Sequence, residues 1–144
     1  MLIGEFTNKV GEKNRIALPK KFREILGEDV IVTRGYEDCV IVVNQKQWEK
    51  LLKVFSDQPF TKSPVRDTRR FLIGGASEAS LDKQGRFVLP KNLKDFAGIL
   101  REVTFIGLVD WVEIWSKEKW EKRMDMIKPN AAKIAEKLQE INEK

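Results

Sequence analysis

Two arginines, Arg15 and Arg86, are the residues of this chain whose type and setting favour recognition chemistry. Each follows a short polar turn, GEKN at 11–14 and DKQG at 82–85, and each opens a short apolar segment. A guanidinium group presents its N–H donors in a planar fork that matches a phosphate group or the O6 and N7 acceptors of guanine. The pattern therefore makes the two arginines candidates for contact with a phosphate group or a guanine edge.

The two arginines occupy equivalent positions in an internal repeat. The segment VGEKNRIALPKKFREIL (10–26) aligns with LDKQGRFVLPKNLKDFA (81–97) at an offset of 71 residues, and the tripeptide WEK recurs at 48–50 and 120–122. A duplication over nearly the whole chain sets the architecture. The chain is predicted to contain two copies of one small module.

Hydrophobic alternation predicts which way each arginine faces. In the segment RIAL, Arg15 alternates with Ile16 and Leu18, and RFVL repeats the pattern in the second copy. A period of two places such neighbours on opposite faces of a strand. Asn14 and Gly85 occupy the same place in the turn, and both tolerate a positive φ. Each arginine is thus expected on the face opposite the core.

The remainder of each copy is predicted to form a short helix, an apolar hairpin and a closing helix. The short helix is expected to start at Pro19 in the first copy and Pro90 in the second, and to stop at Gly27 and Gly98. Asn44 and Ser116 are expected to cap the two closing helices, because a short polar side chain can accept a hydrogen bond from the first helical turn.

These signals divide the chain into four segments. Residues 1–56 are expected to form the first module with its closing helix, 57–73 a linker with a helix of its own, and 74–128 the second module. The dipeptide Pro129-Asn130 is expected to break the chain, so that 129–144 forms a separate C-terminal amphipathic helix. The apolar stripe of that helix packs either on its own domain or on a neighbouring subunit.

Composition narrows the classes of function. The 144 residues carry a formal net charge of +5, no histidine and one cysteine, Cys39, within the apolar run CVIVV. With no histidine and a single cysteine, a zinc site or an imidazole-activated nucleophile is excluded. We therefore expect a protein that is not an enzyme, with no catalytic residue, metal or cofactor. The absence of a signal peptide or a long apolar run favours a cytoplasmic protein without a membrane partner.

The repeated context of the turns resembles a known family. The sequence of turn, arginine, apolar residue and Leu-Pro, present twice, is similar to the AbrB-like swapped-hairpin family, and two copies in a chain of this length resemble the MraZ family. That family carries D-x-x-x-R in each copy, and the stretch from Asp82 to Arg86 matches it, whereas Gly11 replaces the aspartate in the first copy. The resemblance implies an α+β fold of two tandem AbrB-like swapped-hairpin β modules with short helices, related by a pseudo-two-fold axis within one chain.

The resemblance also implies a function and a set of contact residues. It implies a regulator of the division and cell-wall gene cluster, associated with the nucleoid, that binds short direct repeats in its own promoter as a ring-shaped homo-oligomer. Its contacts with double-stranded DNA are then expected at the turns: Arg15, Lys13 and Asn14 in the first copy, and Arg86, Lys83, Gln84 and Gly85 in the second. Asp82 is expected to orient the second turn, and without its counterpart Arg15 is expected to be less preorganised.

Three alternatives stay open at this level. Each arginine can instead be solvated or pair with a nearby carboxylate such as Asp82. The chain can also be an antitoxin-like protein-binding module that regulates its own gene, because related swapped-hairpin folds occur in antitoxins. The tryptophans can stack on bases, although their apolar neighbours favour packing in a core or an interface. They are Trp48, Trp111, Trp115 and Trp120.

Overall fold

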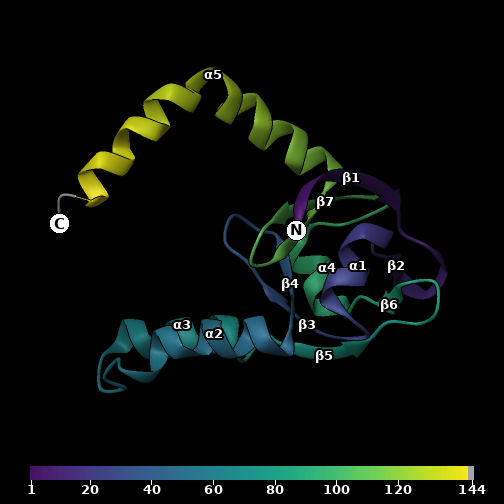
Figure 1. Cartoon of the computed structure of the whole chain (residues 1–144), viewed down its shortest axis with the longest axis horizontal. Helices are drawn as coiled ribbons and strands as arrows, with labels where there is room; N and C mark the ends of the chain where they lie inside the picture. Colours follow the sequence, from purple (N-terminus) through teal and green to yellow (C-terminus); the bar gives the residue numbers. More distant parts are fainter. Residues whose placement is uncertain (143–144) are drawn as a thin grey trace.

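The computed structural model describes residues 1–142 and has a mixed α+β fold (Figure 1). The first copy contributes β1 (Ile3–Lys9), the 3-10 turn η1 (Glu12–Asn14), β2 (Arg15–Ala17), α1 (Lys20–Leu26), β3 (Asp29–Arg34), β4 (Val40–Asn44) and α2 (Gln45–Ser56). Helix α3 (Ser63–Leu72) leads to the second copy, which contributes β5 (Ser77–Ser80), β6 (Arg86–Val88), α4 (Lys91–Ala97), β7 (Glu102–Leu108), β8 (Val112–Ser116) and α5 (Lys117–Asn142). The order of elements repeats, as the duplicated sequence predicts.

Six strands form one antiparallel sheet in the order β1-β7-β8-β4-β3-β5. The first strand of each copy pairs with the hairpin of the other copy, since β1 pairs with β7 and β5 pairs with β3. The two hairpins meet in the middle, where β4 pairs with β8 and Ile41 lies opposite Glu113. The two copies are therefore interleaved, and neither completes its own half of the sheet.

Strands β2 and β6 form a separate two-stranded antiparallel sheet, called the ribbon from here on. Ile16 lies opposite Phe87 at its centre, and both side chains are buried in the main core. Each strand is only three residues long. An isolated two-stranded sheet is at best marginally stable in water, so the ribbon depends on this burial for its stability.

The central strands of the large sheet, β3, β4, β7 and β8, are mostly buried on both faces, which explains their nearly continuous apolar runs. On one face, Val40 and Val42 pack in the main core with residues of α1, α4 and the ribbon. On the other face, Ile41 and Val43 lie in two smaller clusters that include the tryptophans. Burial raises the pKa of the Cys39 thiol above its ordinary value, so Cys39 stays protonated and packs as a small apolar residue, as its setting predicts.

Several helix ends lie where the sequence predicts them. Asn44 caps α2 in a capping box with Gln47: its side chain accepts from the Gln47 amide at 2.9 Å, and its amide donates to the Gln47 side chain at 3.3 Å. Gly27 and Gly98 end α1 and α4 with φ values of 85° and 65°, a region that favours glycine. Pro19 lies one position before α1 rather than inside it.

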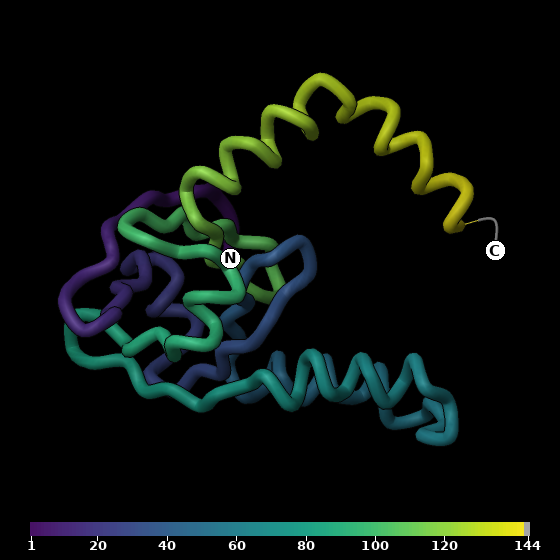
Figure 2. The backbone as a smooth tube through the Cα atoms, turned by 180° about the vertical axis from the view of Figure 1, so that it is seen from behind, coloured from purple at the N-terminus to yellow at the C-terminus, as the bar shows by residue number. Residues whose placement is uncertain are grey.

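The C-terminal helix differs from its prediction. Pro129 was expected to start a separate helix over 129–144, but α5 is one helix from Lys117 to Asn142 with Pro129 inside it, and residues 143 and 144 lie outside the described part. An internal proline removes one backbone donor and crowds the carbonyl four residues earlier, which bends a helix without having to end it. Figures 1 and 2 show α5 as an arch. The side-chain amide of Asn130 donates to the carbonyl of Met126 at 2.8 Å and supports the bent turn.

Two helical projections leave the same side of the body. The α2–α3 pair forms one and α5 forms the other, while the ribbon and its turns lie at the opposite end in both views (Figures 1 and 2). The ribbon is therefore clear of both projections. None of the helices within residues 1–142 combines the length and the apolar character needed to cross a bilayer.

Phe87 and Val88 are adjacent in β6 and provide a matched test of the ribbon. Phe87 is 3% exposed, whereas Val88 is 55% exposed. We expect Phe87→Ala to lower the free energy of unfolding by about 3–5 kcal/mol, because it leaves a cavity in the core. Val88→Ala should change it by less than about 0.5 kcal/mol. Urea unfolding followed by tryptophan fluorescence measures both, and equal effects would contradict the facing of the two side chains.

Candidate nucleic-acid interface

The outer face of the ribbon brings Arg15 and Arg86 together. Antiparallel pairing sets Arg15 opposite Val88 and Arg86 opposite Ala17, so the two arginines lie diagonally across the ribbon. Both side chains line the same two shallow depressions, one beside each turn. Arg15 is exposed and Arg86 is partly exposed. The repeat thus places one guanidinium from each copy on a single surface.

A single carboxylate holds the second turn. Oδ1 of Asp82 accepts from the backbone amides of Gln84 and Arg86, each at 2.9 Å, and its Oδ2 accepts from Nε of Arg86 at 2.8 Å. The amide of Gly85 also donates to the carbonyl of Asp82 at 2.9 Å. Asp82 therefore bonds both the backbone of the turn and the arginine that follows it. Only the Nε donor of the Arg86 side chain is bonded within residues 1–142, so its terminal amino groups keep their donors.

The first turn is built differently, because Gly11 stands where the second copy has Asp82. Lys13 and Asn14 both adopt the left-handed conformation, with φ values of 57° and 60°. Residues other than glycine rarely occupy this region, although asparagine does so more readily than most. Arg15 takes part in none of the ion pairs found within residues 1–142. The first arginine is therefore less constrained than the second.

The backbone of each turn is also bonded to the other copy. The amide of Leu18 donates to the carbonyl of Gly85 at 2.9 Å, and the amide of Leu89 donates to the carbonyl of Asn14 at 2.9 Å. These two bonds occupy equivalent positions in the repeat and extend the pairing of β2 with β6. A displacement of either turn therefore disturbs the contact between the copies.

Two basic helix side chains outside the expected set of contact residues lie over the turns. Nζ of Lys94, in α4, donates to Oδ1 of Asn14 at 2.8 Å. At the equivalent place Arg23, in α1, covers Gly85 so closely that a Cβ on that glycine would lie 2.5 Å from the arginine side chain. Their shared position in the repeat was the available signal. The sequence does not show that each side chain reaches the turn of the other copy.

The remaining predicted contact residues differ in accessibility. Lys13, Lys83 and Gln84 are exposed on the turns, so their side chains are accessible to a partner. Asn14 is partly buried and Gly85 is buried. The conformation of Gly85, with φ of 76°, shapes the turn, and its backbone lies beneath Arg23.

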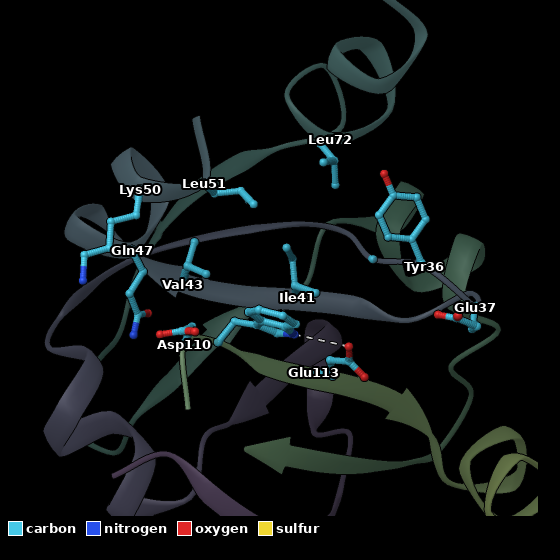
Figure 3. A pocket seen from close by; sticks show the side chains of 12 residues that line it. Tyr36, Glu37, Ile41, Val43, Gln47, Lys50, Leu51, Leu72, Asp110 and Glu113 are labelled. Atoms are coloured by element: carbon cyan, nitrogen blue, oxygen red, sulfur yellow. Dashed lines mark hydrogen bonds between the residues drawn. The ribbon is translucent and has the colours of Figure 1, made fainter. Parts of the chain in front are cut away.

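A separate concave region lies between α2 and the face of the large sheet opposite the main core (Figure 3). It has a volume of about 580 Å³, and apolar side chains such as Ile41, Val43 and Leu51 line much of it. Nε1 of Trp111 donates to Glu113 at 3.2 Å beside it. All four tryptophans pack in the two clusters on this face of the sheet, which favours a packing role over base stacking.

The fold and the ribbon define a class of protein, a duplicated and interleaved α+β module that presents one arginine from each copy on a two-stranded ribbon. The chain belongs to the MraZ family. The profile of that family, described as "MraZ protein, putative antitoxin-like", matches residues 1–71 and matches again over residues 72–141. The two matches correspond to the two copies, and the boundary between them falls at the end of α3.

Proteins named "Transcriptional regulator MraZ" are similar to this chain over nearly its full length. The protein of Natranaerobius thermophilus is 41% identical over 138 residues, which are 96% of each chain. That of Caldicellulosiruptor saccharolyticus is 40% identical over 141 residues, and that of Clostridium tetani is 41% identical over 141 residues. Both of these alignments cover 98% of this chain and 99% of the relative.

The hydrogen bonds to Asp82 lower the pKa of its carboxyl group below the ordinary value of 3.8, chiefly through the backbone amide of Arg86. Because the folded-state pKa is depressed, the carboxylate stabilises the fold above the ordinary pKa, and this contribution is lost as the pH falls through the folded-state value. We expect an NMR titration of the Asp82 carboxyl carbon to give a midpoint below 3.8. In Arg86→Gln the midpoint should rise only part of the way, since the backbone amide remains. A midpoint at or above the ordinary value in the unaltered protein would contradict the turn geometry.

Proposed function

We propose that this chain is a sequence-specific transcriptional regulator that binds double-stranded promoter DNA through the outer face of the ribbon. The observation that carries the proposal is the placement of Arg15 and Arg86, one from each copy, on a single exposed ribbon. Membership of the MraZ family supports the regulatory role, because the relatives are named transcriptional regulators. A protein of this kind acts on the nucleoid in the cytoplasm and needs no cofactor for binding.

The shape and charge of the ribbon suit the major groove of DNA. That groove is about 12 Å wide and accepts a two-stranded ribbon. The terminal amino groups of Arg86 are available for a guanine edge or a phosphate, because Asp82 engages only its Nε. The exposed side chains of Lys13 and Lys83 flank the arginines and suit phosphate contacts. The net charge of +5 favours association with DNA in the same sense.

The interleaving of the copies supports assigning each module to the AbrB-like swapped-hairpin class. The first strand of each copy pairs with the hairpin of the other, and the ribbon pairs symmetrically about Ile16 and Phe87. A pseudo-two-fold axis through the chain then relates the two turns. On this assignment the turns form one recognition surface rather than two independent ones.

A ring-shaped homo-oligomer is the second part of the proposal. One chain offers a single ribbon and few DNA contacts, and a ring that presents several ribbons gains affinity through high effective concentration. Subunits related by rotation face the DNA alike and would read direct repeats, spaced about 10 bp apart to match the helical turn. The resemblance to the family suggests that these repeats lie in the promoter of the division and cell-wall gene cluster, which includes the chain's own gene.

Apolar surface outside the ribbon supports self-association. Ile134, Leu138 and Ile141 lie along α5 and are 44%, 58% and 68% exposed. Exposed apolar stripes of this kind are typical of surfaces that pack on another chain. The hollow of about 580 Å³ beside α2 is a further apolar surface (Figure 3). A neighbouring copy that covers these surfaces leaves the ribbon free, because the ribbon lies at the other end of the body (Figures 1 and 2).

Substitution of the arginines tests the DNA-binding proposal. The probe is a fluorescein-labelled DNA duplex. Its sequence is selected from a random-sequence library by binding to the purified protein. We expect Arg15→Ala and Arg86→Ala each to weaken binding by about 5- to 150-fold, the range for loss of a bidentate base contact. If the lost contact is with a phosphate, the slope of log K against log salt concentration should also become shallower by about 0.9. Fluorescence anisotropy across a salt series measures both.

The matched control is Arg69→Ala, which removes an exposed arginine from α3 in the projection remote from the ribbon. It should leave the affinity within about twofold of the unaltered protein. The proposal is wrong if the double variant of Arg15 and Arg86 keeps both the affinity and the salt slope. It is also wrong if the library yields no enriched duplex.

Light scattering at micromolar concentration tests the ring. We expect a mass several times the 16.7 kDa of one chain. Leu138→Glu should lower that mass, because it places a charge on the apolar stripe of α5. Gln139→Glu introduces the same side chain at the adjacent position and should not. A monomeric mass for the unaltered protein would contradict the ring, and a stoichiometric second protein in the purified material would favour the antitoxin-like alternative.

A further inference from the structure

The two turns are each contacted by one cation from the helix of the other copy. Lys94 bonds the side chain of Asn14 at 2.8 Å, and Arg23 lies against Gly85. Lys94 and Arg23 occupy the same position in the repeat, as do Asn14 and Gly85. Both cations are only partly exposed. The two contacts are therefore one structural feature, built twice with different residues.

The first turn has the greater need of such a contact. In the second turn Asp82 accepts hydrogen bonds from two backbone amides, and Gly85 adopts its positive φ without strain. In the first turn the aspartate is absent, and two consecutive residues with side chains, Lys13 and Asn14, are left-handed. The side chain of Asn14 is bonded to Lys94, and its carbonyl accepts from the amide of Leu89 at 2.9 Å. Both anchors of Asn14 come from the second copy.

We propose that Lys94 is the positioning residue of the first turn, which it supports from the second copy where the first copy has no aspartate of its own. Its hydrogen bond to Asn14 holds that residue in the left-handed conformation. Because Asn14 directly precedes Arg15, this conformation sets the direction in which the chain enters Arg15. Recognition by the first copy thus depends on a side chain of the second. The consequence for DNA rests on the proposed function, whereas the effect on the turn itself does not.

Hydrogen exchange tests the positioning role without DNA. The amide of Leu89 donates to Asn14, and the equivalent amide of Leu18 donates to Gly85 in the other turn. We expect Lys94→Met to speed exchange at Leu89 by about fivefold or more, in keeping with loss of a hydrogen bond to a charged group. Exchange at Leu18 serves as the internal reference and should change by less than twofold. Unchanged or equally accelerated exchange at both amides would overturn the proposal.

DNA affinity distinguishes positioning from a direct phosphate contact. With the library-enriched duplex, Lys94→Met should weaken binding by about fivefold or more while the salt slope stays the same. In an Asn14→Gly background, where glycine takes the left-handed conformation unaided, Lys94→Met should have little further effect. The contrary outcome is a salt slope that is shallower by about 0.9, with the same loss of DNA affinity in the unaltered protein and in Asn14→Gly. It would mean that Lys94 binds a phosphate directly and would overturn the proposal.

Two further variants complete the design. Lys94→Arg retains the charge and the donors, and arginine is the residue at the equivalent position, Arg23. Exchange at Leu89 and DNA affinity should therefore match those of the unaltered protein. Lys91→Met removes a lysine that is paired with Asp95 on the same helix, and it should leave both readouts within twofold. If the unaltered protein binds no DNA, the proposed function fails, and the exchange measurement still decides the role of Lys94.

Discussion

The antiparallel pairing of β2 with β6 is the interaction on which the recognition surface depends. Neither strand exceeds three residues, and within residues 1–142 each pairs with a strand of the other copy alone. Burial of Ile16 and Phe87 holds the pair onto the core, and alternation then turns both arginines outward. The distance between the arginines is therefore fixed by a core contact beneath them rather than by the turns alone.

The same pairing makes the two copies dependent on one another. Each first strand completes the hairpin sheet of the other copy, and each turn receives a backbone hydrogen bond from the other copy. The copies have nevertheless diverged in how the turns are held. Asp82 holds the second turn from within, whereas the first turn is contacted by Lys94 across the interface. Duplication within one chain permits this divergence, because the two turns are encoded separately and need not remain identical.

The separation of the ribbon from the helical projections has a functional consequence under the proposed function. The ribbon lies at one end of the body, and the α2–α3 pair and α5 leave the other side (Figures 1 and 2). Self-association through the exposed stripe of α5 can then proceed without covering the arginines. Charge is distributed in a compatible way, since Arg15 and the turn lysines are accessible while the carboxylate of Asp82 is engaged by hydrogen bonds.

The sequence by itself determined the duplication, the facing of Arg15 and Arg86, the cap at Asn44 and the glycine ends of α1 and α4. These features depend on residues close together in the chain, where alternation and backbone preferences act directly. Only the tertiary structure decided that the copies interleave and that Lys94 reaches Asn14, because those two residues are 80 positions apart. The tertiary structure also decided that α5 continues through Pro129. A proline removes one backbone hydrogen bond, but the helical turns on either side of it keep theirs. Contacts between distant segments are set by the packing of the whole core, which no local pattern specifies.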